Sequence, residues 1–499
     1  MSLDSTLLIA SSGLDAVNRQ LALVSQNVAN ASTPGYLEES LPLSSATAGG
    51  VGSGVTTGPA QLDVNAQLQA ATRQAQSGAS GAATTQTALA AVDGAAGSTG
   101  SSTAIADALG GLQDQFSALE ASPSNQTTQR QVVLQAQQLA GAVNGLAEAG
   151  ATQRQGAQNA LVTEVGQLNQ ALHEIGTLST QITQGKAAGQ STADLEQSRD
   201  QQMSSATQLL GIQFVAQSNG GMQAIVGGIV LPLDATTGTT KNTTFGIGSA
   251  QLSPTTPAAA VPGITLGGQD VTAQLATASG SIGANLQLRD TAMPQMQAEL
   301  DEFSHTLAAR FDAQGLRLFS DAQGNVAPSG GTPAQAGYVG FAQTIQVNPA
   351  VTANPALVQQ GTAGGTAASG STAVIQNVLA YALGADSAAG TPQPAPNTVG
   401  LGVSGTIQAR FGAPGTLADF ASALGSAQAQ AYSTASNAAT TEQATATAMQ
   451  GKLSSASGVN MDTELAHMVA LQNAYSANAR VIAAAQSMWN SLLTAVPSS

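Results

Sequence analysis

The 499-residue sequence contains no cysteine and few aromatic residues, which make up 3% of the chain. Without cysteine it can form no disulfide and no thiolate zinc site, and it has no thiol nucleophile. Its three histidines, His173, His305 and His467, are far apart in the sequence, and isolated histidines are more often structural or exposed than metal ligands. We therefore expect no cofactor and no metal site.

Charge is also scarce, because Asp, Glu, Lys and Arg make up 8% of the chain, against about 25% in typical soluble domains. The 28 acidic and 13 basic residues give a net charge of −15, which repels phosphate backbones and excludes nucleic acid as a partner. Apolar residues at 42% still permit a sizeable core, and the length suits roughly three domains.

Long apolar runs are absent as well. No stretch of about 18 consecutive apolar residues occurs, so we expect no membrane span. The first residues, Met1 to Ser5, carry no basic group, and no apolar segment with a small-residue cleavage site follows them. The sequence therefore predicts no cleaved secretory signal. This permits the cytoplasm, or export by a route that reads no such signal.

Near the beginning of the chain, apolar residues recur at alternating spacings of four and three. This is the pattern of a coiled-coil seam, although an ordinary amphipathic helix of a bundle would also produce it. The helix should end before Thr33-Pro34-Gly35-Tyr36, since Pro-Gly suits a turn. The positions of the seam are Leu3, Leu7, Ala10, Leu14, Val17, Leu21, Val24 and Val28.

The last part of the chain carries a second seam with two polar positions. Asn460 is a candidate N-cap, and Asp462 and Glu464 would lie in the first turn, where carboxylates favour the helix dipole. Residues 461 to 495 are therefore predicted to form one helix. The seam comprises Met461, Leu465, Met468, Gln472, Tyr475, Ala479, Ile482, Gln486, Trp489 and Leu493.

The middle of the chain alternates between helical and strand-like patterns. A main helix is predicted from Pro123 to about Gln184, where an apolar stripe runs from Leu161 to Ile182. Strand-like runs separated by glycines predict a β-meander after residue 211. Further expectations are a linker or extended loop at 44–60, partial helix at 61–110, helices at 195–210 and 296–312, short strands at 234–285, loops and strands at 315–410, and a helix leading into the C-terminal one.

The order helix, helix, β, helix, β, helix, helix predicts an α+β multidomain fold in which the two ends of the chain pair. We expect paired N- and C-terminal α-helices, a helical-bundle domain and inserted β-rich outer domains. The expected domains are a terminal coiled coil (1–40 and 455–499), a helical domain (41–210, 286–320 and 412–454) and a β-rich outer domain (211–285 and 321–411).

Short motifs near both ends resemble those of the rod, hook and hook-associated proteins of the bacterial flagellum. They lie at residues 29–36, 457–462 and 474–479. The resemblance is carried by the conjunction of both ends, since a Pro-Gly turn alone is common. The motif residues are Asn30, Thr33, Pro34, Gly35, Tyr36, Gly458, Val459 and Asn460.

Internal segments are similar to the hook-associated protein 1 family in particular. They are residues 52–55, Asp194-Leu195 with Arg199-Asp200, and Leu288-Arg289-Asp290 with Met293-Pro294. The chain departs from the family pattern at Gln61, where a basic residue is frequent, and at Thr463, where a second acid is usual. These departures affect local contacts only.

The resemblance implies a structural role outside the cell, without enzyme activity. It implies export through the flagellar secretion machine and assembly as a ring of subunits between hook and filament. The implied partners are other copies of the chain, the hook protein, the next hook-associated protein toward the filament, and a FlgN-type export chaperone at the C-terminal helix. The positions expected to pack between subunits are Leu7, Leu14, Val17, Leu21, Val24, Val28, Met461, Leu465, Met468, Tyr475, Ile482, Trp489 and Leu493.

Three alternatives compete with this interpretation. A glycan hydrolase needs two carboxylates across a cleft, whereas Asp301 and Glu302 are adjacent and would point to different helix faces. A hook or rod subunit shares the terminal motifs, but a hook subunit should turn to β structure soon after its first helix. A surface adhesin should carry a cleavable export signal.

Overall fold

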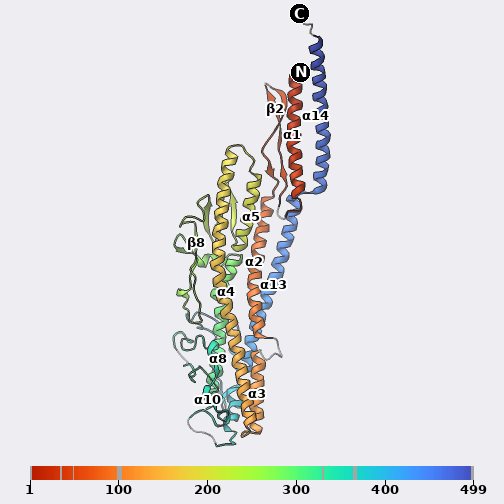
Figure 1. Ribbon diagram of the computed structural model, residues 1–499. Helices are drawn as coiled ribbons and strands as arrows, with labels where there is room; N and C mark the ends of the chain where they lie inside the picture. The colour runs from red at the N-terminus through yellow and green to blue at the C-terminus, as the bar shows by residue number, and fades with distance from the viewer. Residues whose placement is uncertain are drawn as a thin grey trace. The chain divides into compact units, whose positions relative to one another are not determined.

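The computed structural model describes residues 3–33, 36–48, 50–97, 104–328, 331–363 and 368–495. Long helices dominate it, and its sheets have two or three strands each, which is the α+β multidomain class that the sequence predicts (Figure 1). By its internal packing the chain divides into two compact units. The terminal unit comprises residues 1–79, 167–245 and 442–499, and the central unit comprises residues 80–166 and 246–441.

This division groups the chain differently from the three predicted domains. The β-meander after residue 211 belongs to the terminal unit, together with both terminal helices, and not with residues 321–411. The meander joins them because the last third of the long helix α4 (Gln126–Ala187) lies in the terminal unit, and the meander follows it in the chain. The three-domain assignment remains a prediction about independent folding.

The two terminal helices have the predicted extent. Helix α1 spans Leu3–Asn30 and helix α14 spans Met461–Ala495, and they lie side by side with both chain ends at the same end of the pair (Figure 1). The predicted N-cap is confirmed, since the Oδ1 of Asn460 accepts hydrogen bonds from the N–H groups of Asp462 and Thr463, at 3.0 and 3.2 Å. These bonds satisfy donors that the first helical turn leaves unpaired.

The linker predicted at residues 44–60 is wrong, because this segment forms a β-hairpin. Strands β2 (Leu43–Ala48) and β3 (Val51–Thr57) pair antiparallel, and β3 packs on α1. The Oγ of Ser12 accepts a hydrogen bond from the N–H of Val55 at 3.1 Å. A Cβ atom at Gly54, whose φ is +131°, would lie 2.1 Å from that Oγ. Glycine, read from sequence as a sign of a loop, here permits close approach to α1.

The rest of the terminal unit consists of helices and the confirmed meander. Asn169 of α4 fixes the strand that follows the meander, because its side chain accepts from the N–H of Phe245 and donates to the carbonyl of Phe245. The elements are β1 (Glu39–Ser40), β4 (Gln61–Leu62), the start of α2 (Ala66–Ala96), α5 (Ala193–Leu209), β5 (Gln213–Ala216), β6 (Met222–Val226), β7 (Ile229–Leu233) and the end of α13 (Leu417–Ser457). The meander has the strand order β5-β6-β7.

The central unit is built on an apolar core between helices. Parts of α2, α4 and α13 surround α8 (Met293–Ala313) together with α3 (Ile105–Ala121). Phe303 and Phe420 meet edge to face with centroids 5.3 Å apart, and Phe311 meets Phe319 in the same way at 5.4 Å. Such aromatic pairs contribute beyond the area that they bury. Helix α8, predicted from its apolar spacing, is thus the central element of this core.

The section predicted as loops and strands at 315–410 holds more helix than expected. Its strands have two or three residues each, and short helices separate them, so the β-rich assignment of 321–411 is not what the structure shows. The elements are β11 (Phe319–Ser320), α9 (Phe341–Thr344), β12 (Gln346–Val347), α10 (Pro349–Ala353), α11 (Leu357–Gln360), α12 (Ala373–Asn377), η3 (Val378–Ala382), β13 (Asp386–Ala388) and β14 (Thr391–Pro392).

Residues 246–292 of the same unit show the short strands that the sequence predicts, together with helical turns. The elements are β8 (Phe245–Gly246, whose first residue closes the terminal unit), η1 (Ala258–Ala260), β9 (Thr265–Leu266), β10 (Gln269–Asp270), α6 (Thr272–Leu275), α7 (Ser281–Gln287) and η2 (Leu288–Ala292). Strand β9 pairs antiparallel with β10 across Gly267 and Gly268, both at positive φ.

Buried carboxylates on α8 replace a sheet in holding the 321–411 section. Glu299, with no exposed side-chain surface, pairs with Arg410, whose Nη2 lies 2.6 Å from its Oε2. Glu302 accepts hydrogen bonds from the Tyr338 hydroxyl at 2.7 Å and from the N–H of Asn397 at 2.8 Å. Buried carboxylates need such partners, so each loop that supplies one is fixed in place on α8.

None of the described helices combines the length and the apolar character needed to cross a membrane.

We expect Arg410→Ala to destabilise the central unit by about 3 kcal/mol, because it leaves the Glu299 carboxylate buried without its counterion. Arg130→Ala, at an exposed position of α4, is the control and should change stability by less than about 0.5 kcal/mol. Urea unfolding, monitored by the helix signal in far-ultraviolet circular dichroism, compares the unfolding midpoints of the two variants. Equal midpoints for the two variants would contradict the role assigned to the Glu299–Arg410 pair.

Candidate assembly surface

The predicted seam of α1 is covered within the single chain. Val17 and Val24 are each 7% exposed and Ala10 is 3% exposed. The remaining seam positions Leu7, Leu14, Leu21 and Val28 are half-buried. Helix α14 and strand β3 both pack against α1 and provide this cover. The role of these residues between subunits stays a prediction.

On α14 the face that is covered by α1 overlaps the predicted seam only in part. Met468, Ala479 and Ile482 belong to both, and the remaining covered positions are Glu464, Leu471, Ala474, Asn478 and Ala485. The side chain of Asn478 lies against Gly13 of α1, where an added Cβ would be 3.1 Å from its Nδ2. The sequence pattern does not identify this face, because polar residues such as Glu464 and Asn478 lie on it.

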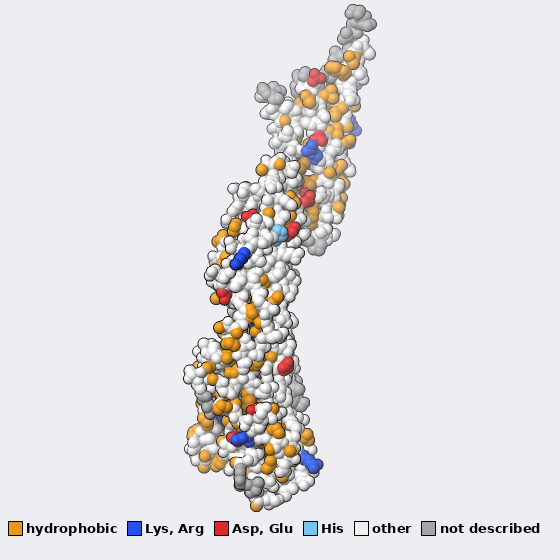
Figure 2. All heavy atoms as spheres, turned by 60° about the vertical axis from the view of Figure 1, so that its left-hand side comes forward, with side chains coloured by type: hydrophobic (Ala, Val, Ile, Leu, Met, Phe, Trp, Pro, Cys, Tyr) orange, Lys and Arg blue, Asp and Glu red, His pale blue; other side chains and the backbone are white. Residues whose placement is uncertain are grey.

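Several large apolar side chains of α14 are exposed, and we call them the exposed apolar row of α14. Five of them, Met461, Leu465, Tyr475, Trp489 and Leu493, are residues predicted to pack between subunits, with exposed fractions from 42% to 60%. Figure 2 shows apolar side chains along this end of the molecule with few charges among them. Many large apolar side chains exposed on one helix favour an interaction site. The remaining members are Val469, Val481 and Met488.

The motif residues near the end of α1 shape the exit from that helix. The N–H of Thr33 donates to the carbonyl of Asn30 at 2.8 Å, and the N–H of Tyr36 donates to the carbonyl of Thr33 at 3.1 Å. The second bond closes the predicted turn. Pro34 and Gly35 lie outside the described residues.

The motif residues before α14 form the corner between α13 and α14. The N–H of Gly458 donates to the carbonyl of Ser454, and an added Cβ there would lie 2.4 Å from that oxygen. Val459 is half-buried and Asn460 caps α14 as described. Glycine therefore permits a tight corner that a larger residue would push open.

Asn27, which sequence reasoning missed, clamps the segment after α1. It is 1% exposed, its Nδ2 donates to the carbonyl of Glu39, and its Oδ1 accepts from the N–H of Glu39 and from the hydroxyl of Tyr36. The same Nδ2 lies 3.4 Å from the Oε1 of Glu464 on α14. Burial, followed by the Glu39 carboxylate, raises the pKa of Tyr36 to about 12. A polar residue within an apolar helix was the available signal.

The family-like acid–base pairs have structural roles. Asp200 forms an ion pair with Arg73 of α2 at 2.8 Å, while Arg199 donates to the carbonyl of Gly220 in the meander. Arg289 instead pairs with its neighbour Asp290, through Nε and Nη2 at 2.7 Å each. Each pair ties a helix to another segment or to its own turn.

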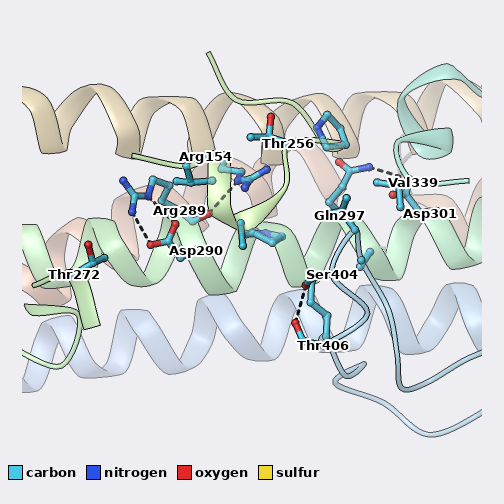
Figure 3. Close-up of a pocket in the computed structure, with 18 of the residues that line it drawn as sticks. Arg154, Thr256, Thr272, Arg289, Asp290, Gln297, Asp301, Val339, Ser404 and Thr406 are labelled. Carbon is cyan, nitrogen blue, oxygen red and sulfur yellow. Dashed lines mark hydrogen bonds and ion pairs between the residues drawn. The ribbon is translucent and has the colours of Figure 1, made fainter. Parts of the chain in front are cut away.

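A pocket of about 370 Å³ in the central unit is lined by Arg154, Asp270, Arg289, Asp290 and Asp301, among others (Figure 3). Its carboxylates are already engaged. The pairing of Asp290 is given above, and hydrogen bonds from Thr272 to Asp270 lower the pKa of that carboxyl. These groups supply no free acid–base pair of the kind that a hydrolase uses.

Asp301 and Glu302, considered above for glycan hydrolysis, act as anchors. Asp301 accepts from the N–H groups of Gly340 and Ala342 at 2.8 and 2.9 Å, and burial raises its pKa to about 7. The nearby His305 stacks on Tyr338 with ring centroids 4.0 Å apart. Within the described ranges, no group of three or more His, Asp or Glu side chains is placed to hold a metal ion.

Three family models match the chain. The model of the helical domain of flagellar hook-associated protein FlgK matches residues 89–326. The model of the C-terminal region of the flagellar basal body rod FlgEFG proteins matches residues 449–495, and that of the flagella basal body rod protein matches residues 7–36. The last two matches coincide with α14 and α1.

Curated relatives agree with these matches. Flagellar hook-associated protein 1 of Salmonella typhimurium is 27% identical over 331 residues, covering 63% of this chain and 57% of that protein. The Escherichia coli protein of the same name is 26% identical over 331 residues, covering 63% of this chain and 58% of that protein. The matched region thus spans less than two thirds of these relatives.

Among solved structures, the flagellar hook junction protein FlgK from Burkholderia pseudomallei is 24% identical, with a TM-score of 0.40, over 53% of this chain and 46% of that one. By these family models and curated relatives, the chain is similar to flagellar hook-associated protein 1.

Proposed function

We propose that the chain is a structural protein of the bacterial flagellum that joins the hook to the filament. The observation that carries the proposal is the set of three flagellar family matches, which includes both terminal helices and the helical domain of hook-associated protein 1. In this proposal the protein is exported by the flagellar secretion system and works outside the cell as a ring of subunits.

The exposed apolar row of α14 supports assembly through the terminal helices. Covering apolar surface yields about 25 cal/mol per Å², and a head-to-tail contact between copies generates rings or helical arrays rather than closed dimers. With charged residues at 8% of the chain, neighbouring copies can approach closely while few charges lose their hydration. The ring, the hook protein and the next hook-associated protein are the partners proposed for this surface.

The same row is the surface that we assign to a FlgN-type export chaperone before assembly. Eight large apolar side chains on α14 are exposed in the single chain, and a chaperone that covered them would keep copies from associating prematurely. The chaperone and the neighbouring subunits would then bind the same face in succession. We also propose that the protein is not an enzyme, in keeping with the engaged carboxylates of the pocket.

A rod or hook subunit is the second candidate, because the models that match both terminal helices are named for basal body rod proteins. The match of the FlgK helical-domain model over residues 89–326 favours the junction.

Deleting the gene in its source organism should leave hooks without filaments and release flagellin into the medium, because filament subunits would have no platform. Electron microscopy and a flagellin assay of the medium measure both. Cells without hooks would favour the rod or hook candidate, and cells with normal flagella would refute the proposal.

Replacing Trp489 and Leu493 by Ser should reduce filament-bearing cells at least about tenfold when the variant complements the deletion, because burial of each side chain contributes about 1.5–3 kcal/mol. Helix content should be unchanged, since both side chains are exposed in the free chain. Asn473→Ser, at an exposed polar position of α14, is the control. Normal filament numbers with the double variant would rule this row out as the assembly surface.

A further inference from the structure

Residues 36–40, which follow α1, are held in the terminal unit by hydrogen bonds of their backbone. The N–H of Glu38 donates to the carbonyl of Ser457 at 3.0 Å, and the carbonyl of Glu38 accepts from the N–H of Asp63 at 3.0 Å. Asn27 holds both backbone groups of Glu39. We call residues 36–40 the joint segment, because they connect α1 with the end of α13, the start of α14 and residues 61–63.

The side chains of the joint segment bring carboxyl groups together. Glu38 faces Glu464 and shares a hydrogen bond with it, and Asp63 and His467 are the other charged or titratable groups acting on it. Glu39 shares a hydrogen bond with Asp194 at the start of α5. Among the described groups that act on these two residues, His467 is the single basic one. Glu39 and Glu464 are 6% and 2% exposed.

Two buried oxygens of this cluster have no hydrogen-bond partner among the described residues, namely Oε1 of Glu39 and Oε2 of Glu464. Two ionised carboxylates cannot bond to each other, whereas a carboxyl and a carboxylate can share one proton. One proton held between the two carboxyl groups of a pair compensates one of their two charges.

We propose that the joint segment is proton-linked: it is held when Glu38–Glu464 and Glu39–Asp194 each retain one proton, and it loosens when both pairs ionise fully. The ligand of this site is the proton itself. Tyr36, whose hydroxyl bonds to Asn27, also faces Glu39, Asp194 and Glu464, so it couples the two pairs to the clamp.

The direction of the effect follows from the carboxyl groups of the joint. Burial, and then the Glu464 carboxylate, raise the pKa of Glu38 above 4.5, and burial, then Asp194, raise the pKa of Glu39 in the same way. A carboxyl whose pKa is higher in the folded than in the unfolded state stabilises below the unfolded value, and that stabilisation is lost as the pH rises through the folded value. We therefore expect the joint segment to be most stable in mild acid.

Hydrogen–deuterium exchange of the full-length chain, corrected for intrinsic exchange, tests this between about pH 5 and pH 8. Protection of the amides of residues 36–40 should fall roughly tenfold as the pH rises, which corresponds to a loss of about 1.4 kcal/mol. In the double variant Glu38→Gln with Glu39→Gln, protection should be high at both pH values, because an amide can donate to the facing carboxylate.

Glu174→Gln is the matched control, at an exposed position of α4 in the same unit, and it should follow the wild-type pH response. Wild-type protection that is constant with pH would overturn the proposal, even if the double variant failed to fold. A double variant with the wild-type response would overturn it too. If millimolar Ca²⁺ or Na⁺ raised the protection of the wild-type protein at pH 8 to its level at pH 5, the ligand would be a bound cation. That result would contradict the proton proposal.

Discussion

The pairing of α1 with α14 is the contact on which the terminal unit depends. These helices come from opposite ends of the sequence, so their contact requires the intervening chain to run out and return. Each helix alone would be marginal in water, because most helix stability comes from packing an apolar face. Their pairing also supplies the support on which the hairpin β2–β3 and the joint segment are laid, since β3 packs on α1 and Asn27 of α1 clamps Glu39.

In the central unit a different constraint holds the chain. The described residues of the section 321–411 form no extended sheet, and its loops are held by hydrogen bonds and ion pairs to acids of α8. Breaking one partner of a buried pair is costly because it leaves a charge without compensation. Three neighbouring acids of α8, Glu299, Asp301 and Glu302, thus specify the course of three separate loop segments through Arg410, Gly340 and Asn397.

The sequence predicts those features that are written in local patterns. The heptads, the Asn460 cap and the Pro-Gly turn locate both terminal helices, and the glycine-separated apolar runs locate the meander. The sequence pattern does not predict those features that depend on contacts between residues far apart in the chain. The local sequence around Gly54 predicts a linker or loop, because nothing local shows that this glycine lies against Ser12.

The assembly surface was predicted in part for the same reason. Helix α14 carries apolar residues on two adjacent flanks, and the sequence pattern cannot distinguish the flank that meets α1 from the flank that stays exposed. Two contacts make the choice: Asn478 lies close against Gly13, and Glu464 accepts a hydrogen bond from Asn27. Each joins residues more than 400 positions apart. The periodicity of the sequence shows which helix faces are apolar. The register of α14 against α1, in contrast, depends on where a small residue such as Gly13 meets a larger polar one such as Asn478.

The distribution of charge connects these observations. A chain with 28 acidic residues and 13 basic ones could have spread them over its surface for solubility, as most soluble proteins do. Instead, several of the acids lie inside, as anchors on α8 and in the joint segment, where a carboxylate specifies one partner because leaving it unpaired is so costly. A surface thereby left poor in charge suits close packing between copies. Buried acids thus fix the course of the loops, and the charge-poor surface suits the contacts that we propose between subunits.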